Sequence, residues 1–262
     1  MSERAPQSAA KVESMETALS TAEKAAIWQM EFPIQRILNQ IAPELEEGAY
    51  RLIIGDDVSG RIPAIVVNEA ITKIYKAYGH PAPMLRFVAG GKREKELPHM
   101  EIKRAEDMRQ RVMGMNEELM QKGISPRALF VTEAISTGEA MKVVSKALST
   151  ERIKTDIAAL GFIGDQFEGG ELKEVEAKLS GARLVYGTKD LPSIYTDNNL
   201  RLLQGVSKEH GSSTSSRLTD HRIHRDDVPY IQAKVNAARV LAIKVGDEVA
   251  SIYLAGKQQK AA

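Results

Sequence analysis

Apolar positions follow two alternating patterns along this chain. Five short runs are mostly apolar, as are strands that are buried on both faces of a parallel sheet. They lie at 51–54 (RLII), 84–89 (MLRFVA), 128–131 (ALFV), 156–163 (DIAALGFI) and 182–186 (ARLVY). Between them, apolar residues recur three and four positions apart, which is the spacing of one helix face. Strands that alternate with helices favour right-handed crossovers, so the pattern predicts an α/β protein with a mostly parallel central sheet flanked by helices.

Helices are predicted between the strands and at both ends of the chain. Those between the strands lie at 62–78, 105–119, 139–148 and 171–179, and the methionines of 105–119 are interpreted as core or subunit contact. A first helix is expected from Glu13, with a restart at Pro33 and an end at Gly48, and Pro229 is expected to start the last helix. The predicted organisation is a disordered tail (1–12), N-terminal helices (13–48), an α/β core (49–197) and a C-terminal capping, helical segment (198–262).

Composition limits the partners. The chain has 262 residues, 43% of them hydrophobic, which is enough for a sizeable α/β domain. Its 36 basic and 35 acidic residues give a net charge of +1, so neither nucleic acid nor an anionic membrane is expected as a partner. The absence of cysteine excludes disulfides and thiolate catalysis. No basic and apolar leader opens the sequence and no run approaches about 18 apolar residues, so a cytoplasmic protein is expected.

Two loops that follow predicted strands contain glycine beside hydroxyl residues. Residues 131–140 (VTEAISTGEA) join a strand to a helix, whose first N–H groups and positive dipole end suit an anion. Residues 55–61 (GDDVSGR) do the same after the first strand, and Arg61 can contact phosphate in a bidentate manner. Carboxyl ends of parallel strands face the binding crevice of an open sheet. A phosphate site is therefore predicted, although the STGEA sequence alone also fits an ordinary Ser or Thr helix cap.

Together these loops resemble the two phosphate loops of type I phosphoribosyltransferases. In that family two acidic residues after a strand hold the ribose hydroxyls, a Thr-Gly turn wraps the 5-phosphate, and an earlier loop ending in Gly-Arg or Gly-Lys binds pyrophosphate. The resemblance covers about 51–186. For the phosphoribosyl group it implies Thr132, Glu133, Ala134, Ile135, Ser136, Thr137, Gly138, Glu139 and Ala140, and for pyrophosphate it implies Asp57, Val58, Ser59, Gly60 and Arg61.

The same resemblance implies further roles. Glu133 corresponds to the second acid, and Lys92, Arg93 and Lys95 lie in a basic segment, 90–104, that resembles the flexible catalytic loop closing over the diphosphate. A solvated surface hairpin is the other reading of that segment. Gly164 and Asp165 correspond to positions near the base, although a plain polar turn is also typical there. Mg²⁺ is implied as the cofactor, held through the ligand, with Asp56 and Asp57 as candidate direct ligands.

The resemblance implies an enzyme of nucleotide metabolism, a pentosyltransferase that acts as a homodimer. It would transfer the phosphoribosyl group of 5-phosphoribosyl 1-diphosphate to a nitrogenous base with release of pyrophosphate. Thr132 stands where the first acid is usual, and this favours the alternative of a non-catalytic sensor of a nucleotide or sugar phosphate on the same fold. A hydrolase or lyase acting on a nucleotide-derived phosphate is a third reading.

Overall fold

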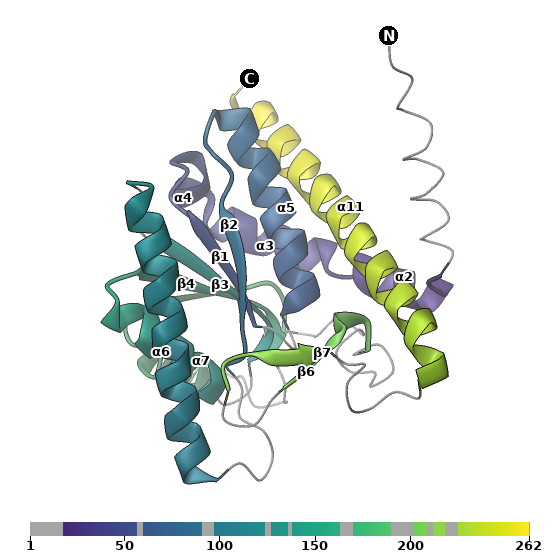
Figure 1. Cartoon of the computed structure of the whole chain (residues 1–262). Coiled ribbons are helices and arrows are strands. Elements are labelled where there is room, and N and C mark those ends of the chain that lie inside the picture. Colours follow the sequence, from purple (N-terminus) through teal and green to yellow (C-terminus); the bar gives the residue numbers. More distant parts are fainter. Residues whose placement is uncertain are drawn as a thin grey trace.

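The computed structural model describes residues 18–56, 60–90, 97–123, 127–135, 138–162, 170–189, 202–208, 212–217 and 225–261. Five parallel strands form one sheet in the order β2-β1-β3-β4-β5 (Figure 1). Their bounds are β1 Leu52–Asp56, β2 Met84–Val88, β3 Arg127–Ile135, β4 Lys154–Phe162 and β5 Arg183–Tyr186. The predicted α/β class with a mostly parallel sheet is confirmed, and all pairings in this sheet are parallel.

Both faces of the sheet are covered, which explains the nearly continuous apolar runs. Successive strand residues point to opposite faces, so Ile53 and Leu129 join one core cluster while Leu52, Ile54 and Phe130 join the other. Because neither face of the inner strands β1, β3 and β4 meets solvent, apolar residues are favoured at nearly every position of these strands rather than at alternate ones.

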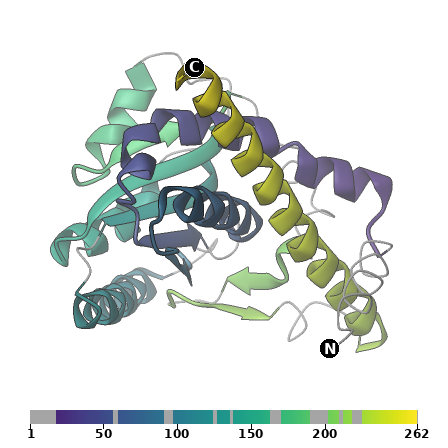
Figure 2. The same ribbon diagram turned by 90° about the horizontal axis from the view of Figure 1, so that it is seen from above.

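One layer of helices contains both ends of the described chain. It comprises α2 Thr21–Trp28, α3 Glu31–Gln40, α4 Ala42–Glu46, α5 Arg61–Tyr78 and α11 Val228–Ala261. The 34-residue α11 packs along α5 and also contacts α2 and α3, the purple helices beside it (Figure 2). Ser20 caps α2 with Glu23 in a capping box, whereas the predicted tail and the helix start at Glu13 lie outside the described residues.

The opposite layer contains α6 Pro98–Gln121, α7 Glu139–Thr150 and α8 Gly170–Ala177. The methionine stripe of α6 is buried here through Met108 and Met115, as core rather than as a ligand surface. The basic segment expected as a loop up to residue 104 is helical from Pro98 onward, because proline is well suited to the first turn of a helix. None of the described helices is long and apolar enough to cross a membrane.

The strand order creates a switch point between β1 and β3. The chain leaves β1 into α5 on one face, and it leaves the neighbouring β3 into α7 on the other. In open α/β sheets the crevice outside such a pair of carboxyl ends is the usual ligand site. We call the end of the sheet at which its strands finish the carboxyl edge, and the opposite end, at which the strands begin, the amino edge.

A segment from the C-terminal part of the chain reaches the carboxyl edge. It includes a 3-10 turn, η1 Leu202–Gln204, and an antiparallel hairpin of β6 Val206–Lys208 and β7 Ser215–Arg217, shown in green in Figure 1. Ser215 and Ser216 of the Ser-rich segment 211–216 thus lie in a strand. The Ala89 N–H group, just after β2, donates to the Ser213 carbonyl over 2.7 Å.

Asp107 of α6 fastens the same hairpin. Its carboxylate accepts hydrogen bonds from the Ser213 N–H group at 2.8 Å and from the Ser213 hydroxyl at 2.6 Å. Burial raises the pKa of Asp107, but the Ser213 hydrogen bonds and the nearby charge of Arg111 outweigh it, so the pKa lies below its usual value. Asp107 therefore remains ionised and accepts these bonds near neutral pH.

Replacing Asp107 with alanine is expected to loosen the hairpin. Ser213 is fully buried, so its hydroxyl and N–H groups would lose their acceptor, at a cost of about 1–3 kcal/mol in the free energy of unfolding. Urea denaturation measures this loss. The neighbouring Glu106→Ala is the control, because Glu106 is exposed and bonds Arg109 and Gln110 on its own helix. Equal losses in the two variants would contradict the role of Asp107.

Candidate functional site

The turn between β1 and α5 is pressed against β3 through Gly60. The Gly60 N–H group donates to the Asp56 carbonyl over 2.7 Å. A Cβ atom on Gly60 would lie 2.4 Å from the Val131 carbonyl oxygen and 2.9 Å from the Asp56 nitrogen. Both neighbours are backbone atoms, so only glycine fits without moving a strand. The start of α5 therefore lies at the carboxyl end of β1 and against the middle of β3.

Arg61 is the first residue of α5 and leans toward β2. Its guanidinium carbon lies 4.5 Å from the centre of the Phe87 ring, a cation–π contact. This contact fixes the positive charge at the β1–β2 side of the carboxyl edge. The role of Arg61 as a pyrophosphate ligand stays a prediction.

The connection from β3 to α7 turns at a second glycine. Gly138 is the N-cap of α7 with φ of 77°, a left-handed conformation that favours glycine. Among the described residues no side chain caps this helix, so the Ser or Thr cap considered from the sequence is not seen at the N-cap position. The first N–H groups of α7, which have no partner within the helix, face the carboxyl edge.

The residues that precede this turn differ in where they lie. Thr132 and Glu133 are both buried near the end of β3, and Ile135 belongs to the core cluster on the α7 face. Ala134 is partly buried, whereas Glu139 is exposed and lies 3.7 Å from both Lys142 and Lys178. The Ile135 side chain is packed in the core and the Glu139 carboxylate lies beside two lysines, so we expect either residue to contact a ligand only through its backbone.

The structure brings part of the predicted site together. Asp56, Gly60, Thr132, Glu133 and Gly138 all lie at the carboxyl ends of β1 and β3 or in the turns that follow. Several other predicted residues lie outside the described residues: Asp57, Val58, Ser59, Lys92, Arg93, Lys95, Ser136, Thr137, Gly164 and Asp165, as does the side chain of Ala140.

Gln204 is a site residue that sequence reasoning missed. Its side chain, at the end of η1, is 2% exposed, and its Oε1 atom accepts a hydrogen bond from the Ile62 N–H group over 3.1 Å. Gln204 thus caps α5 from 142 positions further along the chain. A single glutamine in an irregular segment gives no pattern that could reveal such a contact.

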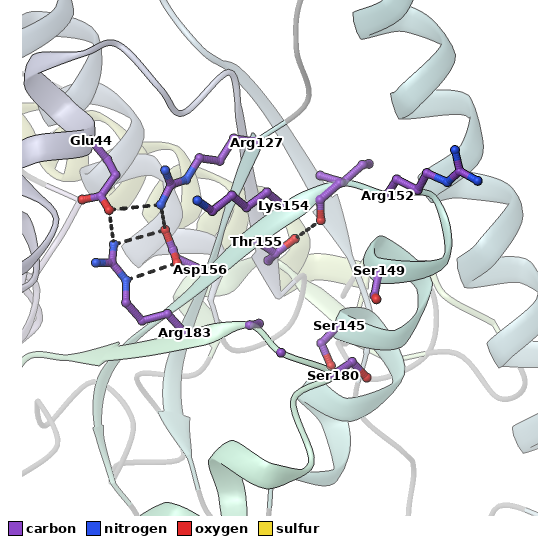
Figure 3. Close-up of a pocket in the computed structure, with 13 residues that line it drawn as sticks. Glu44, Arg127, Ser145, Ser149, Arg152, Lys154, Thr155, Asp156, Ser180 and Arg183 are labelled. Atoms are coloured by element: carbon purple, nitrogen blue, oxygen red, sulfur yellow. Dashed lines mark hydrogen bonds and ion pairs between the residues drawn. The ribbon is translucent and has the colours of Figure 1, made fainter.

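A pocket of about 440 Å³ lies at the opposite, amino edge, where β3, β4 and β5 begin (Figure 3). Asp156 accepts hydrogen bonds from Arg127 at 2.7 Å, from Arg183 at 3.2 Å and from the Tyr50 hydroxyl. Glu44 accepts from the same two arginines at 3.1 and 2.9 Å. Figure 3 shows both carboxylates facing the two guanidinium groups.

This amino-edge network stabilises the fold rather than forming an anion site. Its two carboxylates compensate its two arginines, and Arg152 points away from them (Figure 3). The C-terminal end of α7 also lines the pocket, and its negative dipole end disfavours an anion. Burial raises the pKa of Asp156, but the hydrogen bonds from Tyr50 and Arg127 and the arginine charges lower it below its usual value.

Comparison with known proteins identifies no relative. No protein-family model, curated protein or solved structure matches the chain. Among the described residues no three His, Cys, Asp or Glu side chains are grouped so as to hold a metal ion. The geometry of the carboxyl edge is therefore the basis for a function.

Proposed function

We propose that this protein binds 5-phosphoribosyl 1-diphosphate at its carboxyl edge and transfers the phosphoribosyl group to a nitrogenous base. The observation that carries the proposal is the pairing of Gly60 and Gly138 after two neighbouring parallel strands whose helices leave on opposite faces. β3 extends past the end of β1 to Ile135, so the turn at Gly138 lies further along the strand direction than the turn at Gly60. Two anion-binding turns that follow neighbouring strands in this way suit one ligand that carries a phosphate at each end of a sugar.

In the proposed reaction each loop has one task. The turn ending at Gly138 holds the 5-phosphate, the turn ending at Gly60 and Arg61 holds the diphosphate, and Glu133 accepts a hydrogen bond from a ribose hydroxyl. The bond from C1 of the ribose to the diphosphate oxygen breaks, a base nitrogen bonds to C1 and releases its proton to solvent, and pyrophosphate leaves. Lys92, Arg93 and Lys95 would close over the departing anion and exclude water.

Mg²⁺ fits this arrangement as a cation carried by the ligand. Proteins commonly bind Mg²⁺ through one or two carboxylates together with substrate phosphates and water. Asp56 offers a carboxylate that is 5% exposed at the end of β1, beside the proposed diphosphate turn. When bound, Mg²⁺ would neutralise charge that develops on the departing pyrophosphate. A cytoplasmic location, a homodimer and a role in nucleotide metabolism belong to the same proposal.

A non-catalytic sensor is the second candidate, and Thr132 favours it. Thr132 is buried in β3 opposite Ala159 of β4, at the position where the family has its first acid. A neutral hydroxyl gives a ribose hydroxyl a weaker hydrogen bond than a carboxylate, by roughly twofold in strength. Binding of the sugar phosphate would then persist while transfer is lost.

Calorimetry followed by a turnover assay separates these candidates. The protein is titrated with 5-phosphoribosyl 1-diphosphate and Mg²⁺, and pyrophosphate release is then measured with a panel of purine, pyrimidine and other nitrogenous bases. Binding with release supports the transferase, and binding without release supports the sensor. No heat of binding at millimolar ligand would reject both.

The variant Gly138→Val is expected to lose ligand binding, by about 100-fold or more. A β-branched residue is strained at φ of 77°, and its Cβ atom would lie 3.1 Å from the Val175 side chain. The turn would have to open away from the ligand.

Gly79→Val is the matched control for that variant. Gly79 has the same φ of 77°, but it lies at the C-terminal end of α5, away from the carboxyl edge. A Cβ atom on Gly79 would lie in open space. Calorimetry on both variants, with thermal unfolding to compare their folding, tests the assignment. Wild-type affinity in Gly138→Val would exclude this turn from the binding site.

A further inference from the structure

Gln204 presents a buried hydrogen-bond donor beside the proposed diphosphate turn. Its Oε1 atom is engaged by the Ile62 N–H group, and this bond fixes which end of the amide faces the helix. Its Nε2 atom is buried, and it has no acceptor within the described part of the chain. A buried donor that has lost water without gaining an acceptor destabilises a fold, so such a group calls for an explanation.

The location of this donor suggests its acceptor. Ile62 is the second residue of α5, immediately after Gly60 and Arg61. At the same helix end, the Gly60 N–H group is bonded to Asp56, and Pro63 has no N–H group to offer. By occupying the Ile62 N–H group, Gln204 replaces a backbone donor with its own amide at the start of α5.

We propose that the Nε2 group of Gln204 donates a hydrogen bond to a phosphate oxygen of the ligand's diphosphate. The inference rests on the proposed function, because that function assigns the diphosphate to the turn ending at Gly60 and Arg61. A bound diphosphate oxygen supplies the acceptor that the protein itself does not. Gln204 is thus a binding residue contributed from outside the two sequence motifs.

The C-terminal helix holds this donor in place. Leu203 is 1% exposed within the core cluster that includes α11. Gly205 has φ of 73°, and a Cβ atom there would lie 2.7 Å from the Val235 side chain of α11. Gln204 lies between these two anchors. The segment after the α/β core therefore forms part of the ligand site.

The test uses Gln204→Glu in the full chain, with 5-phosphoribosyl 1-diphosphate and Mg²⁺ as the probe. Glutamate keeps an oxygen that can accept from the Ile62 N–H group but replaces the Nε2 donor. At pH 8 its affinity is expected to fall roughly 10- to 100-fold, the value of a hydrogen bond to a charged group. This loss of affinity relative to wild type should become smaller toward pH 5, because a protonated carboxyl group at position 204 has an O–H group that can donate in place of Nε2. A purely structural cap would show no such pH dependence relative to wild type.

Gln232→Glu is the control, since it makes the same change on an exposed position of α11. Equal affinity of Gln204→Glu and wild type would overturn the role of Gln204 while leaving the proposed function intact. Absence of binding by the wild type would overturn the proposed function as well. If Gln204→Glu fails to fold, the NMR signal of the Gln204 side-chain amide in the wild type decides. A change in its chemical shift when the ligand is added supports the contact, and an unchanged chemical shift refutes it.

Discussion

Gly60→Ala is expected to abolish binding of 5-phosphoribosyl 1-diphosphate and to destabilise the protein. The added Cβ atom would meet the Val131 carbonyl oxygen at 2.4 Å and the Asp56 nitrogen at 2.9 Å. Real Cβ atoms do not approach so closely, and both obstacles are backbone atoms of buried strands, so α5 must shift away from the carboxyl edge. The expected loss is about 1–3 kcal/mol in the free energy of unfolding and, because a misplaced loop loses several hydrogen bonds at once, about 100-fold or more in affinity.

Gly114→Ala is the matched control for this variant. Gly114 lies within α6, and open space surrounds the position of its Cβ atom. Alanine should stabilise that helix by about 0.5–1 kcal/mol and leave ligand binding unchanged. Urea denaturation and calorimetry measure both quantities. A Gly60→Ala protein that is as stable as wild type and binds as tightly would show that close contact between α5 and β3 is dispensable.

The fold could be predicted from the sequence because local pattern and tertiary environment agree. Runs such as 51–54 and 128–131 are apolar without alternation, and the structure buries both of their faces. The strand order could not be predicted from the apolar pattern, since paired residues of β1 and β3, such as Leu52 and Ala128, lie 76 positions apart. Local periodicity carries no information about which strands become neighbours. The same holds for the hairpin, whose three-residue strands, VSK and SSR, contain only one β-branched apolar residue, Val206.

The candidate site was predictable only where backbone geometry requires glycine. Gly60 and Gly138 stand out in sequence because each closes a loop between a strand and a helix, and the structure gives each a steric or conformational reason to be glycine. Gln204 and Asp107 were not predictable. Each acts through a contact across more than 100 positions, and neither residue type is unusual on a protein surface.

The buried position of Asp156 at the amino edge could not be predicted from the sequence either. In sequence it opens an apolar run, as a surface residue at a strand start does, yet its carboxylate is among the most buried in the described structure. Its partners Tyr50, Arg127 and Arg183 come from three separate segments. A charge that far from water is tolerated only because these partners surround it.

Asp156→Asn is therefore expected to cost about 3–5 kcal/mol in the free energy of unfolding, the usual effect of removing one partner from a buried ion pair. Arg127 and Arg183 would retain Glu44 alone, and the Tyr50 hydroxyl would lose its charged acceptor. Glu118→Gln is the control, because Glu118 also bonds two cations, Arg86 and Lys122, but does so at the surface, where solvent screens the ion pairs and a much smaller loss is expected. Denaturant unfolding of the three proteins at pH 7 gives the comparison.

The pH dependence provides an independent check on the charge of Asp156. Its pKa in the folded protein lies below the unfolded value of about 3.9, so the folded state binds fewer protons there and gains stability above that pH. This contribution is complete above about pH 5 and disappears as the pH falls through the folded pKa. The stability difference between wild type and Asp156→Asn should thus be constant from pH 5 to 7 and narrow below pH 4. The asparagine of the variant cannot titrate, so any narrowing of this difference must come from protonation of Asp156 in the wild type. A stability difference that stays constant into acid would mean that the variant is destabilised by altered packing rather than by loss of the charge.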